Sequence, residues 1–177
     1  MAALYVLREM SATHQRDHAS TLAKSNPTKA LAQARNVKEP WFRAQALSWV
    51  ARFTDDPVAV ALEAAKAARE CEDDYKKSAA RAWEIAALAE RGCMVEARKS
   101  LNEALALGKS VSPISSRSEA LFLLLQAAFR IGPDQAKKVY EILSASCPAQ
   151  EHWRCKRAVR DSGKMISGEL EPRRFFW

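Results

Sequence analysis

The sequence predicts an all-α fold in which antiparallel helix pairs repeat along the chain as an α-solenoid. Apolar residues recur with a helical period almost throughout, and alanine is abundant while β-branched runs are scarce. Helix breakers interrupt this pattern at regular intervals. The length of 177 residues suits a single domain over residues 1–177, with the repeats over residues 27–166 and a tail over residues 167–177.

The breakers set the bounds of the expected helices. Proline just inside a helix start and glycine near its end are typical of helix termini, as at Pro27 and Gly92. The carboxylate pairs Asp55-Asp56 and Asp73-Asp74 lie at the turns between helices, where we expect them to cap helix N-termini rather than act as acid–base pairs. The predicted helices are 3–22, 27–37, 41–53, 57–71, 75–91, 94–108, 115–131, 133–146 and 149–166.

The helix pairs repeat in sequence. The segment Arg43 to Ala51 aligns with Ala79 to Ala87 at an offset of 36 residues, and the helix from Ser115 to Arg130 follows at an offset of 38. The second helices share a pattern of a small residue, a large apolar residue and a third apolar residue at i, i+4 and i+7. It occurs at Ala97, Leu101 and Ala104, and again at Ala136, Tyr140 and Leu143.

The segment from Leu88 to Leu107 resembles the tetratricopeptide-repeat superfamily. Gly92, Ala97, Leu101 and Ala104 have the spacing that this family uses for its turn glycine, small residue, large apolar residue and alanine. The resemblance implies a right-handed α-solenoid of about three to four helix pairs that binds other proteins and catalyses no reaction. Offsets of 36 to 38 residues exceed the standard repeat of about 34, so a HEAT-like array stays an alternative.

In such arrays the first helix of each pair usually lines the concave side, so one face of each first helix is the candidate binding surface. On the helix over residues 41–53 this face holds Trp41, Gln45, Ser48 and Arg52. The equivalent positions of the later first helices are Lys77, Arg81, Glu84 and Leu88, then Ser115, Glu119, Phe122, Gln126 and Arg130, and finally Arg154, Arg157, Asp161 and Lys164.

Basic residues dominate this predicted groove. With Arg91 included, it has eight basic and three acidic residues, a net +5 of the chain's +7. A groove of one charge sign attracts ligands of the opposite sign, and interleaved aromatic residues suit a peptide or a nucleic-acid strand. The alternative is a solvated basic face with buried aromatic residues. The candidate partner-binding residues are Trp41, Arg52, Lys77, Arg81, Phe122, Arg130, Arg154 and Arg157.

The sequence therefore predicts a non-enzymatic protein-interaction module that binds an acidic peptide or partner protein in this groove. Nucleic-acid binding along the same groove is the alternative, and a regulatory subunit of a larger assembly is a third interpretation. Self-association through the array ends is also possible in such folds.

No motif for catalysis, a cofactor or a metal stands out. The chain has no phosphate-binding glycine loop and no GxSxG or HExxH motif. His14 and His18 have ligand-like i, i+4 spacing, and Cys147, His152 and Cys155 are close in sequence, but neither set has enough ligands for a structural zinc site. We expect no catalytic residues, no metal and no cofactor.

The composition also bears on localisation. The four cysteines form no CxxC pair, which favours a reducing compartment, and the longest apolar runs are too short to span a membrane. The first nine residues lack a basic start and a small-residue cleavage site, so we expect a cytoplasmic protein without a leader. We expect residues 168–177 to be irregular, with the aromatic residues at 175–177 covering the end of the last helix pair or docking elsewhere.

Overall fold

The computed structural model describes residues 11–148 and 152–176, and all regular secondary structure in these residues is α-helical. The all-α prediction is therefore confirmed for this part of the chain. The helices are α2 (Ala12–Ala23), α3 (Pro27–Arg35), α4 (Pro40–Ala51), α5 (Pro57–Arg69), α6 (Asp74–Ala79), α7 (Arg81–Glu90), α8 (Met94–Ser110), α9 (Ile114–Ile131), α10 (Pro133–Ser146) and α11 (Trp153–Ile166).

Local capping explains where many of these helices begin. Helices α3, α4 and α5 each start at a proline that follows a capping side chain. The capping residues Asn26, Glu39 and Asp56 each accept a hydrogen bond from the backbone N–H three residues later, and Asp73 does the same for α6. The predicted capping role is thus confirmed for Asp56 and Asp73.

The predicted bounds agree closely with the observed ones from α3 to α10. The main difference is that the predicted helix 75–91 is divided at Ala80 into α6 and α7. The turn from α7 to α8 needs a positive φ, +74°, which Gly92 supplies without strain. Residues 3–10 of the first predicted helix and residues 149–151 of the last lie outside the described residues.

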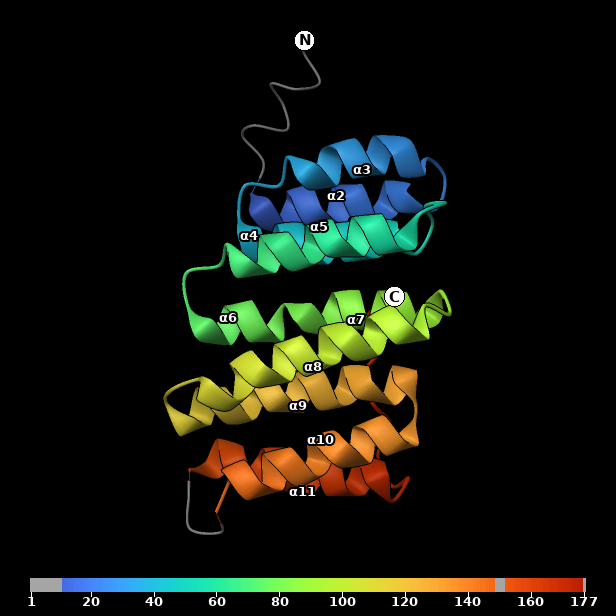
Figure 1. The fold of residues 1–177 in the computed structure, drawn as a ribbon. Coiled ribbons are helices and arrows are strands. Elements are labelled where there is room, and N and C mark those ends of the chain that lie inside the picture. Colours follow the sequence, from blue (N-terminus) through green and yellow to red (C-terminus); the bar gives the residue numbers. More distant parts are fainter. Residues whose placement is uncertain (1–10, 149–151, 177) are drawn as a thin grey trace.

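The helices stack in chain order from α2 and α3 at one end to α10 and α11 at the other (Figure 1). The helices α2, α4, α7, α9 and α11 form one layer, in which each packs against the next. We call this the first-helix layer. Helices α3, α5, α8 and α10 pack beside their partners in that layer.

Small residues allow the helices to approach closely. The buried core divides mainly into one cluster over α7 to α11 and another over α2 to α5, and Trp41 packs against both. In α8 the second-helix pattern is buried, since Ala97, Leu101 and Ala104 are all at most 1% exposed. At Gly108 of α8, an added Cβ would lie 2.9 Å from the Ser78 hydroxyl oxygen, so glycine permits the close contact with α6.

The tail that follows α11 is irregular, as predicted, but it does not cover the end of the last helix pair. It runs back across the first-helix layer, past α9 and α7, to α4 (Figure 1). None of the described helices is both long and apolar enough to cross a membrane.

Candidate peptide-binding face

Two phenylalanines of the tail anchor it to the first-helix layer. Phe175 is 1% exposed, and its ring packs edge-on against Trp83 of α7 with centroids 5.5 Å apart. Phe176 packs edge-on against Trp49 of α4 at 5.2 Å. The neighbouring side chains therefore contact two different helices. Residue 177 lies outside the described residues, so the structure accounts for two of the three terminal aromatic residues.

The backbone of the tail is also bound. The N–H of Arg173 donates to Gln126 Oε1 at 3.3 Å, and Arg130 Nη2 donates to the carbonyl of Arg173 at 3.4 Å. Gln126 is only 5% exposed, and its Nε2 donates to the carbonyl of Phe122, which leaves Oε1 directed at the tail. The first-helix layer thus binds both a peptide group and the side chains of this irregular segment.

Arg52, one of the predicted binding residues, lies at this contact with its charge already paired. Its guanidinium donates two hydrogen bonds of 2.8 Å to the Glu90 carboxylate. The same group lies over the Phe176 ring at 4.3 Å and over the Trp49 ring at 4.8 Å. Arg52 therefore stabilises the docked tail by cation–π interactions and is oriented by its ion pair.

Arg81, predicted to line an open groove, is instead buried. Its side chain is 2% exposed, with Nη2 2.8 Å from Glu84 Oε1 and 3.2 Å from Glu103 Oε2. Burial raises the pKa of the Glu84 carboxyl to about 7, although Arg81 opposes this shift. The position differs from expectation because every residue from Arg81 to Ala89 is buried, so α7 leaves no face open to solvent.

Trp41 and Phe122, the predicted apolar contacts, are half-buried within the protein. Trp41 stacks on Tyr75 at 6.2 Å and meets Trp83 edge-on at 5.6 Å. Phe122 lies under the Arg157 guanidinium at 6.0 Å. The rings of Tyr75, Trp41, Trp83 and Phe175 form a continuous aromatic row that reaches the tail.

The predicted residues Arg154 and Arg157 do come together at an open site. They border a pocket of about 360 Å³ between α6, α9 and α11, which we call the α11 pocket. Its lining consists of Tyr75, Ser116, Glu119, Trp153, Arg154 and Arg157. Lys77 is not part of it and pairs with Asp74 at 3.4 Å.

The electrostatics of the α11 pocket are basic but partly neutralised. Arg157 Nη2 lies 2.5 and 2.7 Å from the two oxygens of Glu119. Arg154 is exposed and has no carboxylate partner among the described residues. Trp153 is 60% exposed, with the two guanidiniums 5.5 and 5.7 Å from its ring. Burial, together with the charges of Glu119 and Asp73, raises the pKa of Tyr75.

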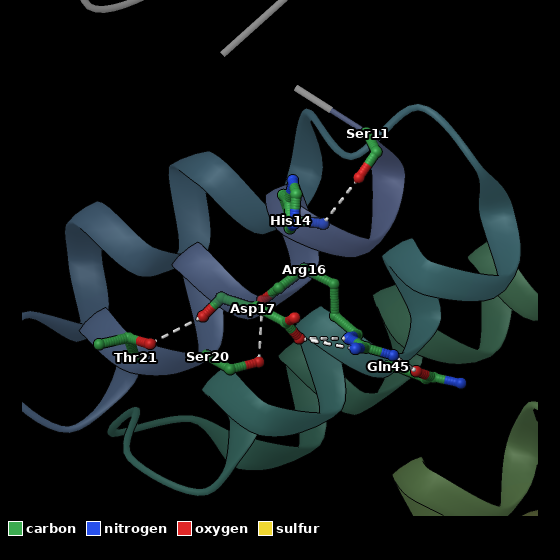
Figure 2. Close-up of polar contacts among 7 residues, drawn as sticks. All are labelled: Ser11, His14, Arg16, Asp17, Ser20, Thr21 and Gln45. Atoms are coloured by element: carbon green, nitrogen blue, oxygen red, sulfur yellow. Dashed lines mark hydrogen bonds and ion pairs between the residues drawn. The ribbon is translucent and has the colours of Figure 1, made fainter. Parts of the chain in front are cut away.

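A second open site lies between α2 and α4. Figure 2 shows Arg16 reaching from α2, where it pairs with Asp17, to Gln45 of α4, to which its Nη1 donates at 2.9 Å. A pocket of about 490 Å³ opens beside this cluster. Asp17, Ser20, Thr21, Lys24, Trp49, Arg52 and Phe53 line it. The Ser20 and Thr21 hydroxyls donate hydrogen bonds to the backbone carbonyls of Arg16 and Asp17.

Sequence analysis missed Trp153, Tyr75 and Arg173. The available signal for Trp153 was its position directly before Arg154, a residue of the predicted groove. No comparable signal marked Tyr75, which follows the capping Asp73, or Arg173 of the tail. Across residues 11–148 and 152–176, no group of three or more His, Cys, Asp and Glu side chains is placed to bind a metal ion.

Comparisons with protein-family models, with curated proteins and with solved structures give no significant match to this chain.

Proposed function

We propose that the protein is a non-enzymatic interaction module, a short right-handed α-solenoid of tetratricopeptide-like helix pairs that binds an acidic segment of a partner protein. The α11 pocket is the proposed ligand site. The observation that carries this proposal is the exposed Trp153, with Arg154 and Arg157 placed against its ring.

The chemistry of this pocket fits a carboxylate next to an apolar group. Tryptophan, tyrosine and arginine are the residue types that contribute most to binding energy at protein interfaces. Arg154 offers donors that no described carboxylate occupies, while Trp153 and Tyr75 offer apolar area. Glu119 orients Arg157 through their ion pair. Its carboxylate also repels an acidic ligand side chain that comes close to it, which limits where such a side chain can bind in the pocket.

The test compares charge reversal inside and outside the pocket. The probe is a labelled library of nine-residue peptides, each with four acidic residues and one aromatic residue. We expect Arg154→Glu to weaken binding by about tenfold or more, because the introduced carboxylate repels the acidic peptide that the guanidinium attracts. The matched control is Arg160→Glu, on the same helix, since Arg160 pairs with Asp161 and does not line the pocket. Equal losses in both variants, or no loss in either, would refute the site.

Nucleic-acid binding is the second candidate, favoured by the exposed Trp153 ring on which a base could stack between two guanidiniums. The same assay with a mixed-sequence eight-nucleotide single strand separates the two functions. Nucleic-acid binding requires that the strand bind tighter than the peptides, with an affinity that falls steeply as salt rises. Tighter peptide binding with a shallow salt dependence supports the protein-interaction function.

A further inference from the structure

The surface that the tail covers, on Trp49 of α4, Trp83 of α7 and Gln126 of α9, is a second candidate site, separate from the α11 pocket; we call it the groove under the tail. We propose that this groove binds a non-helical segment of a partner protein with the pattern basic–acidic–aromatic–aromatic. Residues 173–176, Arg-Arg-Phe-Phe, occupy the same groove within the chain when that partner is absent.

The groove binds the tail as a peptide groove binds a ligand. The tail touches the layer through an irregular segment, while residues 167–171, which link it to α11, are exposed. Its two aromatic side chains pack against different residues, Phe175 against Trp83 and Phe176 against Trp49. Arg173 adds a third contact, since its guanidinium lies 5.5 Å from the Trp83 ring and 5.6 Å from the Phe175 ring.

Groups outside the tail hold the groove in shape. Trp83 packs against Trp41, Arg52 is fixed by Glu90, and Gln126 is fixed by the carbonyl of Phe122. Gln126 Oε1 is a buried acceptor aimed at the position where the tail presents an N–H. These supporting contacts all lie within the helices and not in the tail.

Charge at the position of Arg174 argues that the tail is a weak occupant. Arg174 is exposed beside a pocket of about 380 Å³ that Arg52, Arg130 and Glu90 also line. Arginine therefore lies among two other arginines and one glutamate. An acidic residue at this position is attracted by Arg130 where Arg174 is repelled, so a partner segment with Arg-Glu-Phe-Phe binds more tightly than a free segment with the tail's own sequence.

The experiment removes the tail from the groove after the protein has folded. A recognition sequence for a site-specific protease is inserted in the full chain between the exposed Leu170 and Glu171, and the folded protein is cleaved and dialysed. Binding is measured by fluorescence anisotropy with a labelled, end-capped peptide of residues 171–176. Circular dichroism follows the helical content before and after cleavage.

We expect the cleaved protein to stay helical with a cooperative melt and to bind one peptide per chain. Uncleaved protein binds about tenfold or more weakly, because its own tail competes at high effective concentration. A peptide with Phe175→Ala loses about tenfold or more. A peptide with Arg174→Glu binds about two- to fivefold tighter at low salt, as expected for one surface charge pair.

Several results would overturn the proposal. Loss of helical content on cleavage would make the tail part of the core rather than a ligand. Equal binding by cleaved and uncleaved protein, or by the Phe175→Ala peptide, would place the peptide elsewhere. Weaker binding by the Arg174→Glu peptide would refute the acidic position. Arg160→Glu is the control variant because Arg160 lines neither this groove nor the α11 pocket. The probe here is the peptide of residues 171–176 and the probe of the α11 pocket is the acidic peptide library, so failure here and failure there are distinguishable.

Discussion

Arg81 and Glu84 form an ion pair of 2.8 Å that is buried in the middle of the helix stack. The spacing of Lys77, Arg81, Glu84 and Leu88 is that of one helical face, and a polar face normally indicates solvent. In the structure α7 is surrounded by α4, α5, α8 and α9. A helix in the middle of a stack is covered on all sides, so its polar residues must find partners inside the protein.

The raised pKa of Glu84 predicts a pH dependence of stability. A folded-state pKa of about 7, above the ordinary value of 4.5, means that the folded protein binds more protons between these values. The stability that Glu84 contributes is thus full below about pH 4.5 and is lost as pH rises to about 7. We expect Glu84→Gln to remove this slope, which urea unfolding at pH 5 and pH 7.5 would measure. An unchanged slope in the variant would exclude Glu84 as its source.

Removing the partner of Glu84 should be costly. Arg81→Met leaves a buried carboxylate with no compensating charge at 2.8 Å, and we expect a loss of about 3–5 kcal/mol in the free energy of unfolding at pH 8. The double variant Arg81→Met with Glu84→Gln removes both charges and should recover much of that loss. A double-mutant cycle by urea unfolding gives the coupling. Additive effects of the two substitutions would contradict the paired state.

Individual helices were largely predictable because their ends are determined locally. A capping side chain followed by proline fixes a helix start without tertiary information, as at Asn26-Pro27 and Asp56-Pro57. The division of the predicted helix 75–91 at Ala80 was not predictable, since alanine favours helix and no breaker marks the site. Periodicity similarly predicted the buried stripe of α8 at Ala97, Leu101 and Ala104.

The close packing of α8 on α6 predicts how a substitution at Gly108 changes the stability of the protein. Gly108→Ala should be stabilising by intrinsic helix propensity, but its Cβ would lie 2.9 Å from Ser78 Oγ and 3.2 Å from a methyl of Leu121. We therefore expect a loss of about 1–3 kcal/mol in the free energy of unfolding, measured by chemical denaturation. Adding Ser78→Ala should recover part of it. A stabilised Gly108→Ala variant would show that the two helices separate easily.

The path of the tail across the helices could not be predicted from the sequence. Composition showed that residues 175–177 are aromatic and favour burial, but an irregular segment has no periodicity that names its destination. The groove under the tail is formed by Trp49, Trp83 and Gln126, which lie on three helices and approach one another only after the chain has folded. The candidate site was predictable in part, since Arg154 and Arg157 share a helix and a face.

The tail connects both halves of the molecule, because Phe175 belongs to the core cluster of α7 to α11 and Phe176 also packs against the cluster of α2 to α5. A buried Phe→Ala substitution commonly costs about 3–5 kcal/mol because it leaves a cavity. The tail can undock, which leaves an open groove and no buried cavity. A substitution in the tail therefore cannot lower the free energy of unfolding by more than the free energy with which the tail docks. We expect Phe175→Ala to cost about 1–2 kcal/mol, less than Leu124→Ala in the same cluster at about 2–5 kcal/mol.

A sharper test of how the tail is attached is whether a second substitution in the tail lowers the free energy of unfolding any further. Once Phe175→Ala has released the tail, the contact of Phe176 with Trp49 is lost as well. Adding Phe176→Ala should therefore cost almost nothing more, and urea unfolding of the single and double variants measures this directly. Strictly additive losses would mean that each ring is held independently, as in a core element. Non-additive losses, limited to the docking free energy, are the behaviour of a segment that binds and releases as a unit.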